Sequence, residues 1–116
     1  MNILFVEDEP DTREVTAELM RVMGHQVVDV GNANAALRVL RSGVPIDVLV
    51  CDIGLPGMDG DLLAAEARCL RSELRVVFTT GQNFQQAAKD PFPVVLIKPY
   101  SPDELEAALS TGAGPA

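Results

Sequence analysis

The sequence of 116 residues contains no tryptophan, one tyrosine, one histidine and two cysteines. Two cysteines are too few for a disulfide framework, and the spacing of Cys51 and Cys69 fits no metal motif, so we expect reduced thiols in a cytoplasmic protein. We expect Cys51 to be buried and Cys69 to serve packing rather than chemistry. Tyr100 and Phe92 are too isolated to suggest a stacking surface, and His25 is predicted to be exposed and without a role.

Basic residues and long apolar runs are also scarce. Nine lysines and arginines stand against seventeen acidic residues, which gives a formal net charge of −8. A phosphate backbone would repel such a chain, so no direct nucleic-acid binding is expected. No apolar run approaches the length of a membrane span and no signal-peptide pattern opens the chain, so no membrane insertion is expected. The length fits one domain.

Short apolar runs alternate with stretches of helical periodicity along the chain. The predicted strands are 2–6, 26–30, 46–51, 74–79 and 94–97, and the predicted helices are 11–23, 33–40, 63–70, a short one at 84–88 and 101–109. Five strands alternating with five helices predict an α/β fold, a doubly wound parallel sheet covered on both faces. We expect this domain to span residues 1–110, with a flexible tail at 111–116.

Polar residues follow four of the predicted strands. They are three carboxylates, a hydroxyl and an ammonium, carried by Glu7, Asp8, Asp52, Thr80 and Lys98, with Thr79 at the end of the fourth predicted strand. Ligands of a doubly wound sheet bind beyond the carboxyl ends of its strands, so these groups should meet at one rim. Three carboxylates repel one another, and Mg²⁺ would relieve that repulsion because it prefers carboxylates, water and phosphate oxygens. Together these groups are the parts of a phosphoryl-transfer site.

The stretch LVCDIGLPGMDG ends an apolar run on Asp52. A buried strand would hold this carboxylate at the rim as a nucleophile, and Gly54 would let a backbone carbonyl turn towards a metal. Taken alone, an acidic residue after a strand is more often a helix cap or a solvated charge, and Thr80 or Lys98 alone is more often a strand-end hydroxyl or a surface charge. The coincidence of these types at adjacent strand ends favours the site.

Over nearly its whole length, the chain resembles the receiver domain of two-component response regulators. The matching residues are Glu7-Asp8 after ILFV, Asp52 in CDIGLPGMDG, Thr80-Gly81 after VVFT, and Lys98-Pro99 in LIKPY. Each motif is short, but their order and spacing are specific in combination. The resemblance implies a flavodoxin-like sheet of strand order 2-1-3-4-5.

The resemblance also implies a function. Asp52 would be the phosphoacceptor, taking a phosphoryl group from a histidine kinase or a histidine phosphotransfer domain. Mg²⁺, or Mn²⁺ in its place, would be bound by Asp8, Asp52 and the Gly54 carbonyl, with Glu7 acting largely through water. The domain would catalyse its own phosphorylation and dephosphorylation, without being a classical enzyme. It would signal to a downstream protein that the sequence does not identify.

Further roles follow from the same resemblance. Lys98 would contact the phosphoryl group and Thr80 would hydrogen-bond to it, and the bond from Lys98 to Pro99 would be a cis peptide. Gly54 and Gln82 would flank the path of the attacking water and tune the lifetime of the phosphoryl group. The domain would be a single-domain regulator or the receiver of a hybrid histidine kinase.

The chain departs from the family pattern in two places. Val95 stands where the family commonly carries an aromatic switch residue, so the usual coupling of threonine and ring cannot operate in that form. The stretch between Thr80 and Lys98 is also short, which predicts a shortened fourth helix region.

Two other functions stay open on the sequence. The chain could be a receiver-fold interaction module that acts without phosphorylation, although its complete set of acidic, hydroxyl and lysine residues disfavours this. It could also be a phosphatase of the haloacid dehalogenase class, which uses an aspartate after a parallel strand. That chemistry needs a second aspartate two positions after the first, and here that position is Gly54.

Overall fold

The computed structural model describes residues 1–53, 60–80, 94–98 and 100–111. Its elements are β1 (Asn2–Val6), α1 (Pro10–Val22), β2 (Gln26–Val30), α2 (Ala33–Arg41), β3 (Val48–Asp52), α3 (Gly60–Leu70), β4 (Arg75–Thr80), β5 (Val94–Ile97) and α4 (Pro102–Thr111). The predicted short helix at 84–88 lies outside the described residues, as do Gly54, Gly81, Gln82, Phe92, Pro99 and the segment 112–116. Helix α4 includes Thr111, the first residue of the predicted tail.

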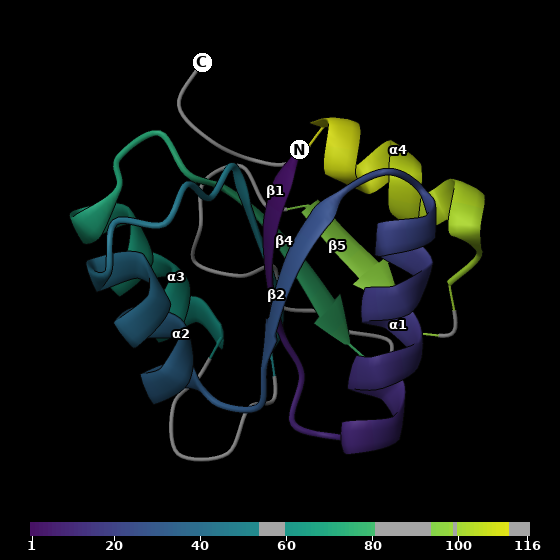
Figure 1. Cartoon of the computed structure of the whole chain (residues 1–116), viewed down its shortest axis with the longest axis horizontal. Coiled ribbons are helices and arrows are strands. Elements are labelled where there is room, and N and C mark those ends of the chain that lie inside the picture. The colour runs from purple at the N-terminus through teal and green to yellow at the C-terminus, as the bar shows by residue number, and fades with distance from the viewer. Residues whose placement is uncertain (54–59, 81–93, 99, 112–116) are drawn as a thin grey trace.

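The five strands form one parallel sheet in the order β2-β1-β3-β4-β5, as the family resemblance implied. Helices α2 and α3 cover one face of the sheet, and α1 and α4 cover the other (Figure 1). All carboxyl ends of the strands therefore meet at one edge. None of the helices in the described part of the chain is long and apolar enough to cross a membrane.

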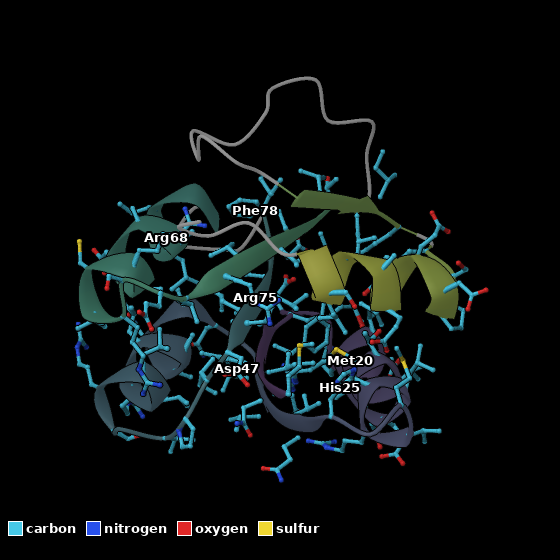
Figure 2. The ribbon with its side chains drawn as sticks, turned by 90° about the horizontal axis from the view of Figure 1, so that it is seen from above. Met20, His25, Asp47, Arg68, Arg75 and Phe78 are labelled. Atoms are coloured by element: carbon cyan, nitrogen blue, oxygen red, sulfur yellow. The ribbon has the colours of Figure 1, made fainter. Side chains whose placement is uncertain are left out.

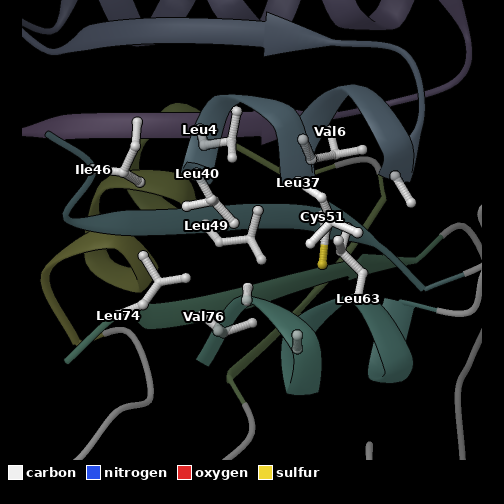
Figure 3. Close-up of a cluster of buried hydrophobic side chains, with 14 of the residues drawn as sticks. Leu4, Val6, Leu37, Leu40, Ile46, Leu49, Cys51, Leu63, Leu74 and Val76 are labelled. Carbon is white, nitrogen blue, oxygen red and sulfur yellow. The ribbon is translucent and has the colours of Figure 1, made fainter. Parts of the chain in front are cut away.

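Two apolar cores separate the sheet from its two helical layers. The first core lies under α2 and α3 and includes Leu4, Leu49 and Val76 (Figure 3). The second lies under α1 and α4 and includes Phe5 and Val50. Neighbours along a strand belong to opposite cores because successive side chains of a strand point to opposite faces. The central strands are therefore buried on both sides, which explains their nearly unbroken apolar sequences.

Local capping explains where the helices begin. The Asn32 side chain accepts a hydrogen bond from the Ala35 amide at 2.8 Å at the start of α2. Before α4, the Glu104 amide donates to the Ser101 hydroxyl at 3.1 Å and the Ser101 amide donates to the Glu104 carboxylate at 3.0 Å. This reciprocal pair is the capping box that the sequence predicted.

The apolar spacing that indicated α1, namely Val15, Leu19, Val22 and Met23, matches its buried face only in part, because Leu19 and Met23 pack against the second core and the two valines do not. Val15 and Val22 are 69% and 76% exposed, whereas Thr16, Ala17 and Met20 are buried. When α1 docks on the sheet, it therefore turns the face with Thr16, Ala17 and Met20 towards the strands. Thr16 and Ala17 are small, and both are buried there.

Two further expectations are wrong. The His25 side chain is 9% exposed: its Nδ1 lies 3.2 Å from the terminal amine and its Nε2 lies 3.2 Å from Glu106 Oε2, so it joins the end of α1 to α4 (Figure 2). Cys69 is exposed, because α3 turns Leu63 and Ala67 towards the core and leaves position 69 outside. Cys51 is buried, as predicted.

Candidate functional site

The predicted site residues lie at the carboxyl edge of the sheet, where β1, β3, β4 and β5 end. Asp52 is the last residue of β3, and its side chain is 16% exposed. Glu7 and Asp8 directly follow β1, which is paired with β3. Adjacent parallel strands therefore deliver three carboxylates to one place, as the sequence analysis expected.

The three carboxylates form a compact group. Glu7, Asp8 and Asp52 each offer a ligand oxygen, and these oxygens lie within 4.8 Å of one another. The group ranges from buried Glu7 to exposed Asp8, so one side is open to an incoming ion. Several hard carboxylate oxygens around one point suit a hard divalent cation such as Mg²⁺. The donor set thus fits the metal that the family resemblance implied.

Lys98 supplies the positive charge of the site. Its Nζ lies 2.5 Å from Glu7 Oε1 and 2.9 Å from Asp52 Oδ2. Partial burial by itself lowers the pKa of Lys98, but the hydrogen bonds and charges of Glu7 and Asp52 outweigh burial and raise that pKa above its ordinary value. Lys98 therefore stays charged at neutral pH and partly offsets the repulsion among the carboxylates.

Glu7 is more firmly held than the sequence suggested. Its side chain is 1% exposed; Oε1 accepts from Lys98, and Oε2 accepts from the Glu9 amide at 3.2 Å. The Glu7 carbonyl accepts from Arg13 Nη1 at 3.0 Å, and the Glu7 amide donates to the Val30 carbonyl at 3.1 Å. Direct contact with Lys98 was not expected of a residue predicted to act largely through water.

The other predicted residues have different outcomes. Thr80 ends β4 and is 7% exposed. Its carbonyl accepts from the Lys98 amide at 2.7 Å, which carries the pairing of β4 and β5 one residue past Ile97. The hydrogen bond from Thr80 to a phosphoryl group stays a prediction. Gly54 lies outside the described residues, so the carbonyl ligand expected there also stays a prediction.

Sequence reasoning gave no role to Arg13, which borders the site from α1. Besides the Glu7 carbonyl, its guanidinium faces Asp29 of β2, with Nε 3.8 Å from Oδ2. Gly31 leaves room for it, because a Cβ added there would lie 2.5 Å from Arg13 Nη1. A cation in the first predicted helix, five residues after Asp8, was the only signal in the sequence.

Gly60 lies against the backbone that carries Asp52. A Cβ at position 60 would lie 2.8 Å from the Asp52 carbonyl oxygen and 2.8 Å from Ile53 Cα. We expect Gly60→Ala to push the end of β3 away and to lower the free energy of unfolding by roughly 1–3 kcal/mol, because backbone atoms cannot yield as a side chain can. Urea denaturation measures this change.

Gly31→Ala is the matched control for Gly60→Ala. Its added methyl would meet only the end of the flexible Arg13 side chain, so the loss of stability should be smaller. Equal stability of the Gly60→Ala variant and the unmodified protein would contradict the expected contact.

The fold and site define a class: a flavodoxin-like α/β domain with a carboxylate cluster and a lysine at the carboxyl edge of its sheet. Within that class, the chain belongs to the response regulator receiver domain family, whose family model matches residues 3–110. The resemblance stated from the sequence motifs is thus confirmed.

Curated relatives include regulators and sensor kinases. The transcriptional regulatory protein AruR of Pseudomonas aeruginosa is 33% identical over 114 residues, covering 89% of this chain and 45% of that protein. The sensor histidine kinase RcsC of Salmonella typhi is 31% identical over 117 residues, covering 97% of this chain and 12% of that protein. The chain spans less than half the length of the first curated relatives that it matches.

Solved structures agree with this placement. The receiver domain of the hybrid histidine kinase CckA is 30% identical, with a TM-score of 0.81, and the match covers 96% of this chain and 97% of that one. The response regulator protein TrrA of Thermotoga maritima, solved in complex with Mg²⁺–BeF, is 27% identical with a TM-score of 0.81, covering 95% of this chain and 96% of that one.

Proposed function

We propose that this chain accepts a phosphoryl group on Asp52 from a phosphohistidine of a histidine kinase or a histidine phosphotransfer domain, in a Mg²⁺-dependent reaction. One observation carries the proposal: Asp52 stands in a group of three carboxylates within 4.8 Å, and one of its oxygens lies 2.9 Å from the Lys98 ammonium. The same residue is thereby next to a cation-binding site and next to a fixed positive charge.

The transfer would proceed by attack of an Asp52 Oδ on phosphorus. As the oxygen–phosphorus bond forms, the bond from phosphorus to the imidazole nitrogen breaks, and its electron pair stays on the imidazole, which takes up a proton. Lys98 would pair with the phosphoryl oxygens, and Thr80 would donate a hydrogen bond to them. Bound Mg²⁺, held by Asp8 and Asp52 with Gly54, would supply charge neutralisation at the carboxylates and the phosphoryl group.

The cycle would close by hydrolysis on the domain itself. Water attacks phosphorus, the bond to Asp52 Oδ breaks, and inorganic phosphate leaves while the carboxylate regains its charge and a proton passes to solvent. Gly54 and Gln82 are the residues that we expect to influence access of this water.

The signal would reach a downstream protein through a change in conformation, in a single-domain regulator or in the receiver of a hybrid kinase. Val95 is partly buried and packs against the first core, so the switch would work without an aromatic ring at that position. We place the reaction in the cytoplasm, where the thiols of Cys51 and Cys69 would stay reduced.

Incubation with acetyl phosphate tests the proposal. Intact-mass measurement should find one added phosphoryl group per chain with Mg²⁺ or Mn²⁺ and none with EDTA, because the three carboxylates then lack a compensating cation. Failure to gain a phosphoryl group in every condition would contradict the proposal. Suppose that a partner also bound equally well with and without beryllofluoride, which mimics the phosphoryl group. The chain would then be an interaction module that acts without phosphorylation.

A further inference from the structure

The Thr79 hydroxyl is an unexplained polar group in the interior. Thr79 is 0% exposed, and its Oγ1 has no hydrogen-bond partner among the described residues. A buried hydroxyl without a partner lowers stability, whereas valine has the same shape without that cost. Such a group is therefore a reason to look for a function at the position.

The strand register places Thr79 beside the phosphoacceptor. Asp52 and Thr79 are direct partners in the pairing of β3 with β4. Both follow the row that faces the second core, because Val50 and Val77 belong to that core and stand two residues earlier. Direct partners on one face of a sheet are neighbours, so the Thr79 side chain lies next to that of Asp52.

Lys98 lies on the same side of the sheet. It stands two residues after Leu96, which is the β5 partner of Thr79 and belongs to the second core. To reach Asp52 on β3, the Lys98 side chain must pass the end of β4. The ion pair between Lys98 and Asp52 therefore spans the position of Thr79.

We propose that Thr79 is a further catalytic residue, which shortens the lifetime of the phosphoryl group on Asp52. This inference rests on the proposed function. Phosphorylation removes the negative charge of Asp52 and adds negative oxygens on phosphorus, so the Lys98 ammonium follows the charge and leaves Asp52 Oδ2. The Thr79 hydroxyl, which has no competing partner in the described structure, then donates its hydrogen bond to that oxygen.

The hydrogen bond would assist hydrolysis. When water attacks phosphorus and the bond to Asp52 breaks, the electron pair returns to the carboxylate, so negative charge develops on the oxygens of Asp52. A donor aimed at developing charge stabilises the transition state more than the acyl phosphate, in which the carboxyl oxygens of Asp52 carry no net charge. Thr79 would thereby raise the rate of dephosphorylation, and Thr80 on the opposite face of β4 would not replace it.

Thr79→Val removes the hydroxyl and keeps the shape, and Thr79→Ser keeps the hydroxyl. After labelling with acetyl phosphate and Mg²⁺ and rapid removal of the donor, we expect the valine variant to retain its phosphoryl group at least roughly tenfold longer than the unmodified protein, with a near-normal lifetime in the serine variant. In EDTA, the valine variant should have a Tm higher by roughly 3–6 °C, because the unpaired hydroxyl is gone.

Thr79→Ala is the second variant without the hydroxyl, and it should also lengthen the lifetime if the valine side chain disturbs folding. Equal lifetimes in the valine variant and the unmodified protein would overturn the role of Thr79 while leaving Asp52 as the phosphoacceptor. A serine variant that fails to restore the lifetime would show a structural effect and would also overturn it. Absence of labelling in the unmodified protein would overturn this inference together with the proposed function.

Discussion

Asp52→Asn is expected to abolish uptake of the phosphoryl group from acetyl phosphate. An amide oxygen is a poor nucleophile and carries no charge, so it cannot form the acyl phosphate that the carboxylate forms. The substitution keeps the size of the side chain and leaves Lys98 its contact with Glu7, so the fold should persist. Intact-mass measurement after incubation with Mg²⁺ should detect no added phosphoryl group.

Asp103→Asn is the matched control for this experiment. It makes the same chemical change at an exposed position in the first turn of α4, at a residue that is not one of the three clustered carboxylates. The Asp103→Asn variant should be labelled as the unmodified protein is. Normal labelling of the Asp52→Asn variant would mean that another carboxylate accepts the phosphoryl group.

Lys98→Met is expected to lower the free energy of unfolding by about 3 kcal/mol in the absence of divalent cations. The substitution leaves the 1%-exposed Glu7 carboxylate without its cation and removes the charge between Glu7 and Asp52. Mg²⁺ should restore much of this lost stability, because it binds the carboxylates of the folded protein only. In the variant, the Lys98 ammonium no longer competes with Mg²⁺ for those carboxylates. Urea denaturation with EDTA and with Mg²⁺ measures both effects.

The pH dependence adds a second readout of Lys98. Because its pKa is raised in the folded state above the ordinary 10.5, the stability that it contributes is fully present below pH 10.5 and is lost as pH rises through the folded-state pKa. Burial also raises the pKa of Tyr100, so the stability that its neutral hydroxyl contributes is likewise lost as pH rises. The Lys98→Met variant should therefore lose less stability above pH 10.5 than the unmodified protein.

Lys98→Arg is the charge-keeping control, and it should recover most of the stability in EDTA. If Lys98→Met unfolds at the same urea concentration as the unmodified protein in EDTA, the ion pairs of Lys98 do not stabilise the metal-free fold. In that case the lysine would serve the phosphoryl group alone.

Much of the site could be predicted because its residues follow buried strands. Asp52 ends one apolar run, and the acidic pair Glu7-Asp8 follows another. Because ligands of a doubly wound sheet bind beyond the carboxyl ends of its strands, the sequence alone predicted that these residues meet at one edge. The contact of Lys98 with Glu7 was not predictable in that way, since 91 positions separate the two residues and only the strand order brings them together. The burial of Glu7 was missed for the same reason.

The two threonines of β4 mark the limit of sequence reasoning. Both were placed at the end of a strand, and the family pattern selected Thr80. Which of them shares a face with Asp52 depends on the register, because a shift of one residue moves every side chain of a strand to the other face. The observed pairing of Asp52 with Thr79 decides it.

The sequence by itself determined the order of strands and helices, the double burial of the central strands and the edge at which the charged groups meet, because hydrophobic periodicity and chain connectivity are local properties. Only the tertiary structure decided which row of α1 is buried, that Lys98 bridges Glu7 and Asp52, and that Thr79 lies beside the phosphoacceptor. These features depend on how elements dock and on strand register, and both are set by packing between residues far apart in the chain.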